Sequence, residues 1–353
     1  MKENHFEEKI VSVEKFKDFR GLDLSNKDFR NISIDILMTT DFDSLTKWPS
    51  QEKLPVNFNP EAILENGKNP GLGLDELHKQ GVTGKGINVA IIDQKLDLNH
   101  KEYSSNVVDY EEFGKSKKED ISMHGPAVAS LFVGKSCGVA PEARLHYKAI
   151  PSGDNQNWEY SAESLNKIIN YNDTVEDKNK IKVVSYSNGY PNPFFKGDLD
   201  NWKKTIEKAR ESGIIVVDGN TLIDSNFIGG GSFDDKENID KYNKWLGLED
   251  DKKKEGLYIP YSLQGEDGII IPCDYRTVAS SQKEKNGYLF LHTVGISGSV
   301  PYLAGLFSLM LQVNKNLKME EMTKIIHDTA ITNKNGLKII NPKGIIDLVK
   351  SIL

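Results

Sequence analysis

The chain has 353 residues, 38% of them hydrophobic, and carries a formal net charge of −7 at pH 7. This length and apolar content suffice for one large globular domain or two ordinary ones. The acidic balance excludes the basic surface of a nucleic-acid-binding protein. Its two cysteines, Cys137 and Cys273, are too few for a disulfide framework, and we expect both to be buried free thiols.

The first residues have no apolar core followed by a small-residue cleavage site, so they do not read as a signal peptide. No apolar stretch has the length of a membrane span. We therefore expect a cytoplasmic protein with no membrane partner, with export by a non-standard route left open.

Residues 1–80 differ in composition from the rest of the chain and are expected to form an N-terminal extension. They are polar, with several prolines, and end in a helix-like stretch over 74–80. Within 21–34, apolar residues recur in a way that hints at one or two five-residue coils, as in a fragment of a pentapeptide solenoid. Solenoids need several repeats to bury a core, so we expect an irregular segment.

From residue 81 onward, apolar runs typical of buried parallel strands alternate with helical patterns. The expected strands are 87–92, 144–150, 183–187 and 214–217, and the expected helices are 125–132, 161–171 and 199–212. Such alternation predicts an α/β fold with a parallel sheet.

The region 230–265 interrupts this pattern. It is charged and rich in glycine and tyrosine, which predicts a surface insertion. Strands are expected afterwards at 268–272, 276–280 and 287–292, then helices at 298–313, 319–329 and 343–353. For the last helix, Asn341 is the expected N-cap, with Pro342 at the first helical position.

Ser297 lies in the stretch Gly-Ile-Ser-Gly-Ser-Val-Pro (295–301), directly before a long apolar helical pattern. Backbone N–H groups at a helix N-terminus are unpaired and the helix dipole favours negative charge there. An oxyanion could be stabilised at such a place. The simpler interpretation of the serine is a plain N-cap.

Three other polar residues follow the expected strands or begin a helix. Asp93 ends the strand 87–92, His124 opens the next helix, and Asn220 follows the strand 214–217. Open α/β sheets place their sites at the carboxyl ends of the strands. A serine nucleophile needs a base, a group that orients the base, and donors for the oxyanion. Taken singly, each residue also fits a turn or a cap.

Four blocks of the chain resemble the subtilisin-like serine proteases, or subtilases. They are Val-Ala-Ile-Ile-Asp (89–93), His-Gly-Pro-Ala-Val-Ala (124–129), Gly-Val-Ala-Pro-Glu-Ala (138–143), and Gly-Ile-Ser (295–297) with Pro301 and Ala-Gly (304–305) after it. The order Asp, His, Ser is that of subtilisin. The resemblance covers roughly residues 80–350. It implies a catalytic domain over 81–353 with a subtilisin-like three-layer fold, a central mostly parallel sheet and helices on both faces.

The resemblance also implies a serine endopeptidase that acts on peptide or protein substrates without a cofactor. Ser297 would be the nucleophile, His124 the general base and acid, and Asp93 the group that orients the imidazole. The Asn220 side chain and the Ser297 N–H would form the oxyanion hole. The calcium-binding loop of many subtilases is missing before the Gly-Val-Ala-Pro stretch, so we expect no metal site.

The same alignment places five residues beside the bound peptide: Ser187, Asn188, Gly189, Asp218 and Gly219. Ser187 to Gly189 resemble the family's substrate-binding strand, to whose edge an extended peptide would add. If the Asp218 carboxylate faces the first specificity pocket, a basic side chain would be favoured there. If it faces away, it has no such role.

Several neighbours of these residues depart from the family pattern, including Gln94, Lys95, Pro126 and Ile296. A displacement of about 1 Å in a catalytic group can cost on the order of 10²-fold in rate. The alternative function is therefore a weak or inactive pseudoprotease that binds peptides or a partner protein. Two roles also stay open for residues 1–80: an inhibitory arm across the cleft, or a segment packed permanently on the catalytic domain.

Overall fold

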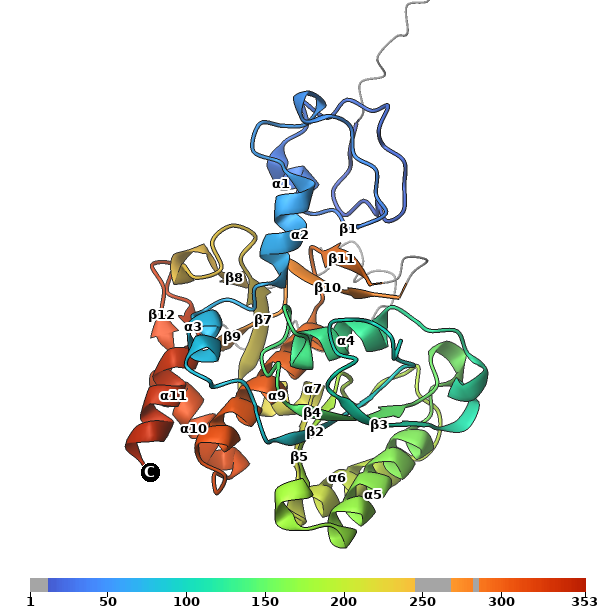
Figure 1. Ribbon diagram of the computed structural model, residues 1–353, viewed down its shortest axis with the longest axis vertical. Coiled ribbons are helices and arrows are strands. Elements are labelled where there is room, and N and C mark those ends of the chain that lie inside the picture. Colours follow the sequence, from blue (N-terminus) through green and yellow to red (C-terminus); the bar gives the residue numbers. More distant parts are fainter. Residues whose placement is uncertain (1–11, 245–267, 282–285) are drawn as a thin grey trace, which may run out of the picture.

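A five-stranded parallel sheet forms the centre of the computed structural model, with strand order β3-β4-β2-β5-β6 (Figure 1). The structure describes residues 12–244, 268–281 and 286–353. The strands are β2 (Asn88–Asp93), β3 (Val107–Glu112), β4 (Arg144–Ala149), β5 (Ile181–Tyr186) and β6 (Ile215–Asp218). Every residue of β2 is buried because β4 and β5 flank it, so Asp93 emerges at the middle of the carboxyl edge.

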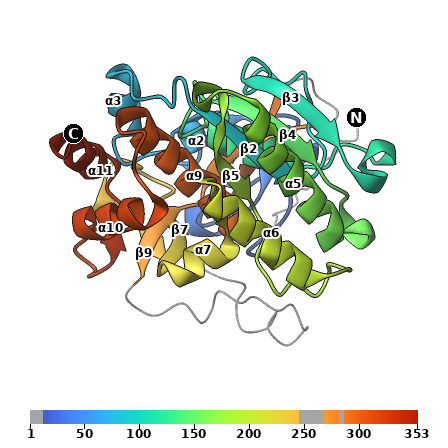
Figure 2. The ribbon, with the colours of Figure 1, turned by 90° about the horizontal axis from the view of Figure 1, so that it is seen from below.

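Helices cover both faces of this sheet because alternate residues of a strand point to opposite sides. On one side, Ala90 and Ile92 join a core with α5 (Trp158–Thr174) and α6 (Leu199–Glu211), which lie across the sheet in Figure 2. On the other side, β2 packs against α4 (His124–Val133) and α9 (Ile296–Val313). The expected three-layer α/β fold is thus confirmed.

Helix α9 is the central helix of the larger core. It is long and apolar enough to span a membrane, so the expectation that no stretch has this length was wrong, but 78% of its 18-residue window is buried inside the structure. The two cysteines, Cys137 and Cys273, are buried and free, as the sequence predicted.

A second sheet has the strand order β12-β13-β9-β7-β8. Its members are β7 (Phe227–Gly231), β8 (Asn243–Lys244), β9 (Ile269–Pro272), β12 (Ile331–Thr332) and β13 (Lys338–Ile339). The neighbouring helices are α7 (Gly219–Asp224), α10 (Met319–Thr329) and α11 (Pro342–Ser351). The cap expected for the last helix is confirmed, since the Asn341 side chain accepts from the Gly344 N–H and Pro342 is the first helical residue.

The third sheet joins the two ends of the chain, in the order β1-β11-β10. Strand β11 (Gly287–Leu291) pairs with β10 (Arg276–Ser280) on one edge and with β1 (Phe42–Asp43) on the other, both antiparallel. Strand β1 belongs to residues 12–58, here called the N-terminal unit. This unit also contains α1 (Ile34–Leu37) and lies above β10 and β11 in Figure 1.

The N-terminal unit is a short coil with a five-residue period, so the irregular segment expected from the sequence was wrong. Phe19, Leu24 and Phe29 recur at this spacing and are buried. Their N–H groups donate to the backbone oxygens of Asp41, Lys47 and Lys53, and each of their own carbonyls closes a turn three residues on. Phe19, Phe29, Phe42 and Phe58 all surround the indole of Trp48, with ring centroids 5.1–5.7 Å away.

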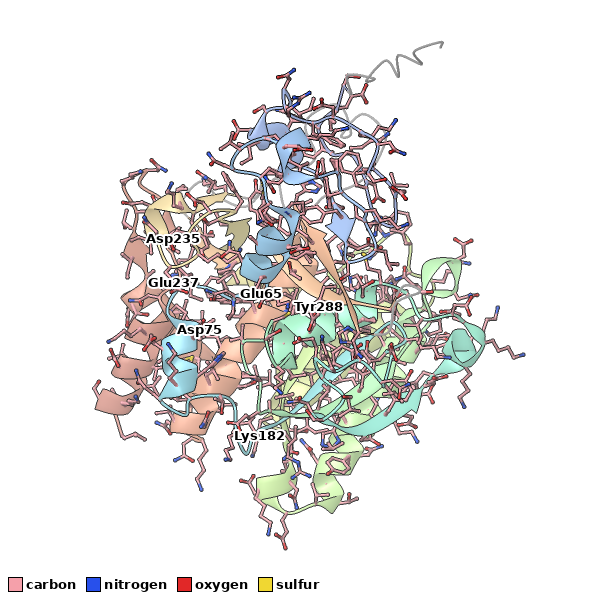
Figure 3. The ribbon with its side chains drawn as sticks, turned by 45° about the horizontal axis from the view of Figure 1, so that its top comes forward. Glu65, Asp75, Lys182, Asp235, Glu237 and Tyr288 are labelled. Carbon is pink, nitrogen blue, oxygen red and sulfur yellow. The ribbon has the colours of Figure 1, made fainter. Side chains whose placement is uncertain are left out.

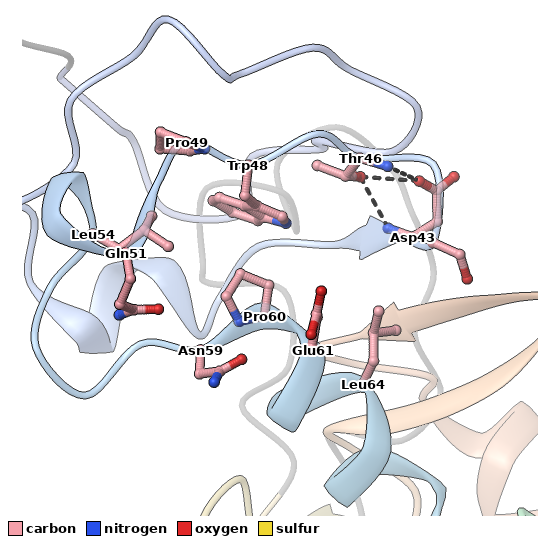
Figure 4. Close-up of a pocket in the computed structure, with 11 residues that line it drawn as sticks. Asp43, Thr46, Trp48, Pro49, Gln51, Leu54, Asn59, Pro60, Glu61 and Leu64 are labelled. Carbon is pink, nitrogen blue, oxygen red and sulfur yellow. Dashed lines mark hydrogen bonds between the residues drawn. The ribbon is translucent and has the colours of Figure 1, made fainter.

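A cavity of about 370 Å³ opens between this unit and the start of α2 (Pro60–Lys68). Figure 4 shows Trp48 above Pro60 at its centre, with the Glu61 carboxylate on the α2 side. The Asp43 carboxylate lies at the edge of the cavity. Its Oδ1 atom accepts hydrogen bonds from the N–H and the hydroxyl of Thr46.

The chain runs from α2 to α3 (Leu74–Lys79) along the described part of the predicted insertion, residues 230–244. The Glu237 carboxylate accepts from the Gly73 N–H at 2.6 Å and from Asn69 Nδ2 at 3.1 Å, on the side of the molecule shown in Figure 3. Lys236 is buried and donates to two backbone oxygens. This part is therefore more embedded than its charge suggests, and the remainder, 245–265, lies outside the described residues.

Candidate active site

The carboxylate of Asp93 lies at the end of β2 and is 1% exposed. Its Oδ1 atom accepts from the Gln94 N–H at 2.7 Å and contacts Nδ1 of His124 at 2.6 Å. The strand end and the turn after it therefore fix this oxygen in one place.

His124 is the first residue of α4, and the glycine after it allows the helix to approach the sheet closely. A Cβ atom on Gly125 would lie 2.4 Å from the Gln94 carbonyl oxygen and 2.6 Å from the Tyr147 hydroxyl. Tyr147 itself donates to the Gln94 oxygen. Only glycine fits this approach, which brings the His124 ring to Asp93.

The imidazole of His124 bridges Asp93 and Ser297. Its Nε2 atom lies 3.0 Å from Ser297 Oγ. With the proton on Nδ1, as the contact to the carboxylate requires, Nε2 accepts from the serine hydroxyl. Burial lowers the pKa of His124, but the charge and hydrogen bond of Asp93 outweigh this effect, so the pKa lies above its ordinary value of 6.5.

Ser297 is the second residue of α9, and the residue before the helix turns the chain sharply. Gly295 has φ 63° and ψ −157°, a conformation open almost only to glycine. The serine hydroxyl thereby lies at the N-terminal turn, where helix N–H groups have no intrahelical acceptor.

A proline four residues after Ser297 frees the serine carbonyl. In a helix this oxygen would accept from the N–H of residue 301, but Pro301 has none. The Ser187 hydroxyl donates to it instead, at 3.3 Å. From the sequence, Ser187 was expected only beside the bound peptide. The proline at this spacing was the signal for a second role, as a brace for the serine.

Asn220 lies in the first turn of α7 and is half-buried. Its Oδ1 accepts from the Tyr190 N–H at 2.7 Å, and its Nδ2 donates to the Tyr190 oxygen at 2.8 Å. The side chain thus holds the loop that follows β5. Sequence reasoning missed Tyr190 because nothing in its local pattern indicates this contact.

Asn188 and Gly219 connect the two loops at this edge of the sheet. The Gly219 N–H donates to the Asn188 oxygen at 2.8 Å, and the Asn188 N–H donates to the Tyr186 oxygen at 2.7 Å. Gly189 lies between Asn188 and Tyr190 and is half-buried. The loop after β5 and the start of α7 are therefore joined to each other, and Ser187 connects the loop to Ser297.

Asp218 lies differently from the pocket-facing position considered from the sequence. It is 0% exposed and is the N-cap of α7, where Oδ1 accepts from the N–H and the hydroxyl of Thr221. Burial raises the pKa of Asp218. Its carboxylate is committed to the helix because an N-cap must satisfy N–H groups that have no other acceptor.

The described residues contain no group of three or more His, Cys, Asp or Glu side chains placed to hold a metal ion. The side chains that meet at this site are a hydroxyl, an imidazole and a carboxylate in a hydrogen-bonded line.

Comparison with known proteins identifies the family of the chain. The family model described as "Subtilase family" matches residues 84–344. The chain belongs to the subtilase family. The major intracellular serine protease of Bacillus subtilis (strain 168) is 31% identical over 179 residues, which cover 48% of this chain and 51% of that protein. The matched part thus spans about half the length of this relative.

Two solved structures share the fold of this chain. The prenylagaramide maturation protease PagA has a TM-score of 0.53 at 18% identity, covering 79% of this chain and 99% of that one. Fervidolysin from Fervidobacterium pennivorans, a keratinolytic enzyme related to subtilisin, has a TM-score of 0.54 at 14% identity. The match covers 78% of this chain and 44% of that one.

Proposed function

We propose that this chain is a serine endopeptidase that uses Ser297, His124 and Asp93 as a catalytic triad. The observation that carries the proposal is the unbroken line from Asp93 Oδ1 through both nitrogens of His124 to Ser297 Oγ, with contacts of 2.6 and 3.0 Å. Membership of the subtilase family supports it.

In the proposed reaction, Ser297 Oγ attacks the carbonyl carbon of the scissile peptide bond and its proton passes to His124 Nε2. The Asp93 carboxylate stabilises the imidazolium that forms. Collapse of the tetrahedral intermediate breaks the C–N bond, and the leaving amine takes the proton from Nε2. Water then takes the place of the amine. Its oxygen attacks the acyl carbon as His124 Nε2 takes its proton, and the bond from that carbon to Ser297 Oγ breaks as Nε2 returns the proton to Oγ, which releases the acid and restores Ser297.

The oxyanion of the tetrahedral intermediate needs donors aimed at it. We assign this role to the Ser297 N–H, at the start of α9, and to Asn220. The Nδ2 group of Asn220 has two hydrogens, and one of them is donated in the hydrogen bond to the Tyr190 oxygen. The second is the donor proposed for the oxyanion.

We infer that the substrate is an extended peptide segment that lies along residues 187–189, with Gly219 on the opposite wall. Backbone groups at the end of a strand can pair with such a segment, so main-chain hydrogen bonds would hold it. We place the enzyme in the cytoplasm, as the name of the intracellular Bacillus relative supports. We assign no cofactor to the reaction.

Hydrolysis of an unstructured protein such as casein by the purified full chain tests this function. We expect cleavage at internal bonds, and we expect Ser297→Ala to lower kcat by about 10⁶-fold, the magnitude known from a family member. Ser308→Ala is the matched control, because Ser308 lies on the same helix and its hydroxyl donates to the Ala304 oxygen. Equal activity in wild type and Ser297→Ala would refute the triad. No cleavage by any of the three proteins would favour the peptide-binding pseudoprotease.

A further inference from the structure

We propose that the N-terminal unit is a permanent part of the catalytic machinery, and that Asp41 within it is a positioning residue for the nucleophile segment. This inference rests on the proposed function, because it concerns how Ser297 is held. It decides between the two roles left open for this end of the chain, in favour of permanent packing.

The contact that carries the inference joins Asp41 to His292, five residues before Ser297. Oδ1 of Asp41 accepts from the His292 N–H at 3.0 Å and lies 2.7 Å from His292 Nδ1. Both side chains are largely buried: 20% of the Asp41 side chain and 12% of the His292 side chain are exposed. The Phe16 ring, from the same unit, lies 5.3 Å from the imidazole of His292.

The coil of the N-terminal unit holds Asp41 rigidly. The Asp41 N–H donates to the Lys17 oxygen, and the Asp41 oxygen accepts from the Phe19 N–H. These bonds fix the backbone of Asp41, and the His292 N–H and Nδ1 at the same oxygen fix the direction of the carboxylate. His292 is therefore held by a rigid group rather than by a flexible surface side chain.

Strand β11, which leads to Ser297, also depends on this unit for its edge and its packing. Phe42 and Asp43 pair with Phe290 and Leu289 of β11. Phe290 is 1% exposed and belongs to the core of the N-terminal unit, with its ring 5.0 Å from that of Phe42. Without residues 12–58, the strand would lose one of its two partners and a buried aromatic contact.

Beyond His292, the segment is anchored from the other side. The Thr293 hydroxyl donates to Asp274 Oδ1 at 2.9 Å, and Asp274 is 4% exposed. Residues 292 and 293 are thus fixed by carboxylates from two separate segments of the chain, Asp41 and Asp274. Gly295 and Ser297 follow directly, so a shift of His292 moves the nucleophile.

The N-terminal unit also contacts the segment that contains His124, the proposed general base. Nη1 of Arg20 lies 3.3 Å from Sδ of Met123, the residue before His124. Asp18 holds the guanidinium through two bonds, at 2.8 and 2.6 Å. Residues 12–58 therefore contact both chain segments whose side chains meet at the active site.

Amide hydrogen exchange in a Ser297→Ala background tests, without any need for activity, whether Asp41 holds the segment that leads to Ser297. We expect Asp41→Ala to speed exchange over residues 286–296 by about 10- to 100-fold, because a buried hydrogen bond to a charged group is lost. Asp23→Ala is the matched control, since Asp23 lies in the same coil but pairs with Lys47 at the surface. Equal exchange in both variants would overturn the proposal.

Kinetics in the Ser297 protein separate positioning from general destabilisation. We expect Asp41→Ala to lower kcat at least about 10-fold with little change in KM, and Asp41→Asn to recover part of the loss, because its amide oxygen still accepts from the His292 N–H. Unchanged kcat in Asp41→Ala would contradict a positioning role. If the wild type itself is inactive, the proposed function fails. The exchange experiment alone then tests whether Asp41 holds the segment around His292.

A cleavage experiment distinguishes a permanent unit from an inhibitory arm. Val56 is 95% exposed, so a site for a sequence-specific protease can be placed at residues 55–57. We expect the nicked N-terminal unit to stay bound through gel filtration and activity to persist, or activity to be lost if the unit dissociates. Dissociation with equal or higher activity would overturn the proposal.

Discussion

The carboxamide of Asn220 holds both backbone groups of Tyr190, accepting from its N–H at 2.7 Å and donating to its oxygen at 2.8 Å. One side chain therefore fixes the loop after β5 and has one N–H left, which is the donor proposed for the oxyanion. The proposed donor role would depend on the loop contacts, because the bonds to Tyr190 also orient the amide.

Replacement of Asn220 by alanine removes both functions. We expect kcat to fall about 10²–10³-fold, the magnitude for loss of one oxyanion donor in a member of this family. The loop around Tyr190 should also become more accessible, which limited proteolysis by a second protease can detect. A variant with normal kcat but a loosened loop would show that Asn220 is a loop clamp and no oxyanion donor.

The pH profile of kcat/KM should report His124. The imidazole must be neutral to accept the proton of Ser297, so activity falls as the pH drops through its pKa. Because Asp93 raises that pKa, we expect the acid midpoint above 6.5. In Asp93→Asn the raising effect is lost and burial dominates, so the midpoint should move below 6.5, while kcat drops about 10⁴-fold.

The control for this profile is Asp177→Asn, which removes an exposed carboxylate paired with Lys182. Its acid midpoint should match the wild type. A midpoint that does not move in Asp93→Asn would show that the carboxylate does not set the ionisation of His124.

Substitutions of Asp218 should change stability and leave the preference for the substrate side chain alone. Asp218→Ala removes the cap of α7 and should lower the free energy of unfolding by about 0.5–2 kcal/mol. Asp218→Asn keeps an oxygen for Thr221. Because burial raises the pKa of Asp218, its ionised form opposes folding above the ordinary pKa, so Asp218→Asn should be as stable as wild type or more so at neutral pH.

Thermal unfolding of the two variants and cleavage-site profiling of a peptide library check this prediction. If Asp218→Asn instead lost a preference for basic substrate side chains, the Asp218 carboxylate would have to face the specificity pocket, which would contradict this prediction.

Gly295→Ala should reduce both stability and activity. A side chain at φ 63° and ψ −157° costs of order 1–3 kcal/mol, and relief of that strain would move Ser297. Gly213→Ala is the control, because Gly213 also has positive φ (79°) but a Cβ there would meet no atom within 4 Å. We expect the control to lose about 1 kcal/mol of stability and no activity in the folded enzyme. Equal kcat in both variants would contradict a special role for the turn before Ser297.

The regular part of the fold was predictable because its signals are local. The apolar run 87–92 and the helical pattern 319–329 correspond to β2 and α10 within one residue. Strand β3 was missed because it is a partly exposed edge strand with no continuous apolar run, and β7 because its last three residues are glycines. Such segments become strands only through their neighbours in the sheet.

The polar contacts of the site were less predictable. The sequence indicated which residues could act, but not that Asn220 holds Tyr190, that Ser187 contacts the Ser297 carbonyl, or that Asp41 reaches His292. These pairs are separated by 30, 110 and 251 positions, and no local pattern fixes the direction of their side chains.

Labelling of the full chain with a fluorophosphonate probe, followed by peptide mass spectrometry, tests the central claim most directly. The account predicts labelling at Ser297 alone, blocked by phenylmethylsulfonyl fluoride and lost in both Ser297→Ala and His124→Ala. Absence of labelling in the wild-type protein, or equal labelling in His124→Ala, would contradict an activated serine at this site.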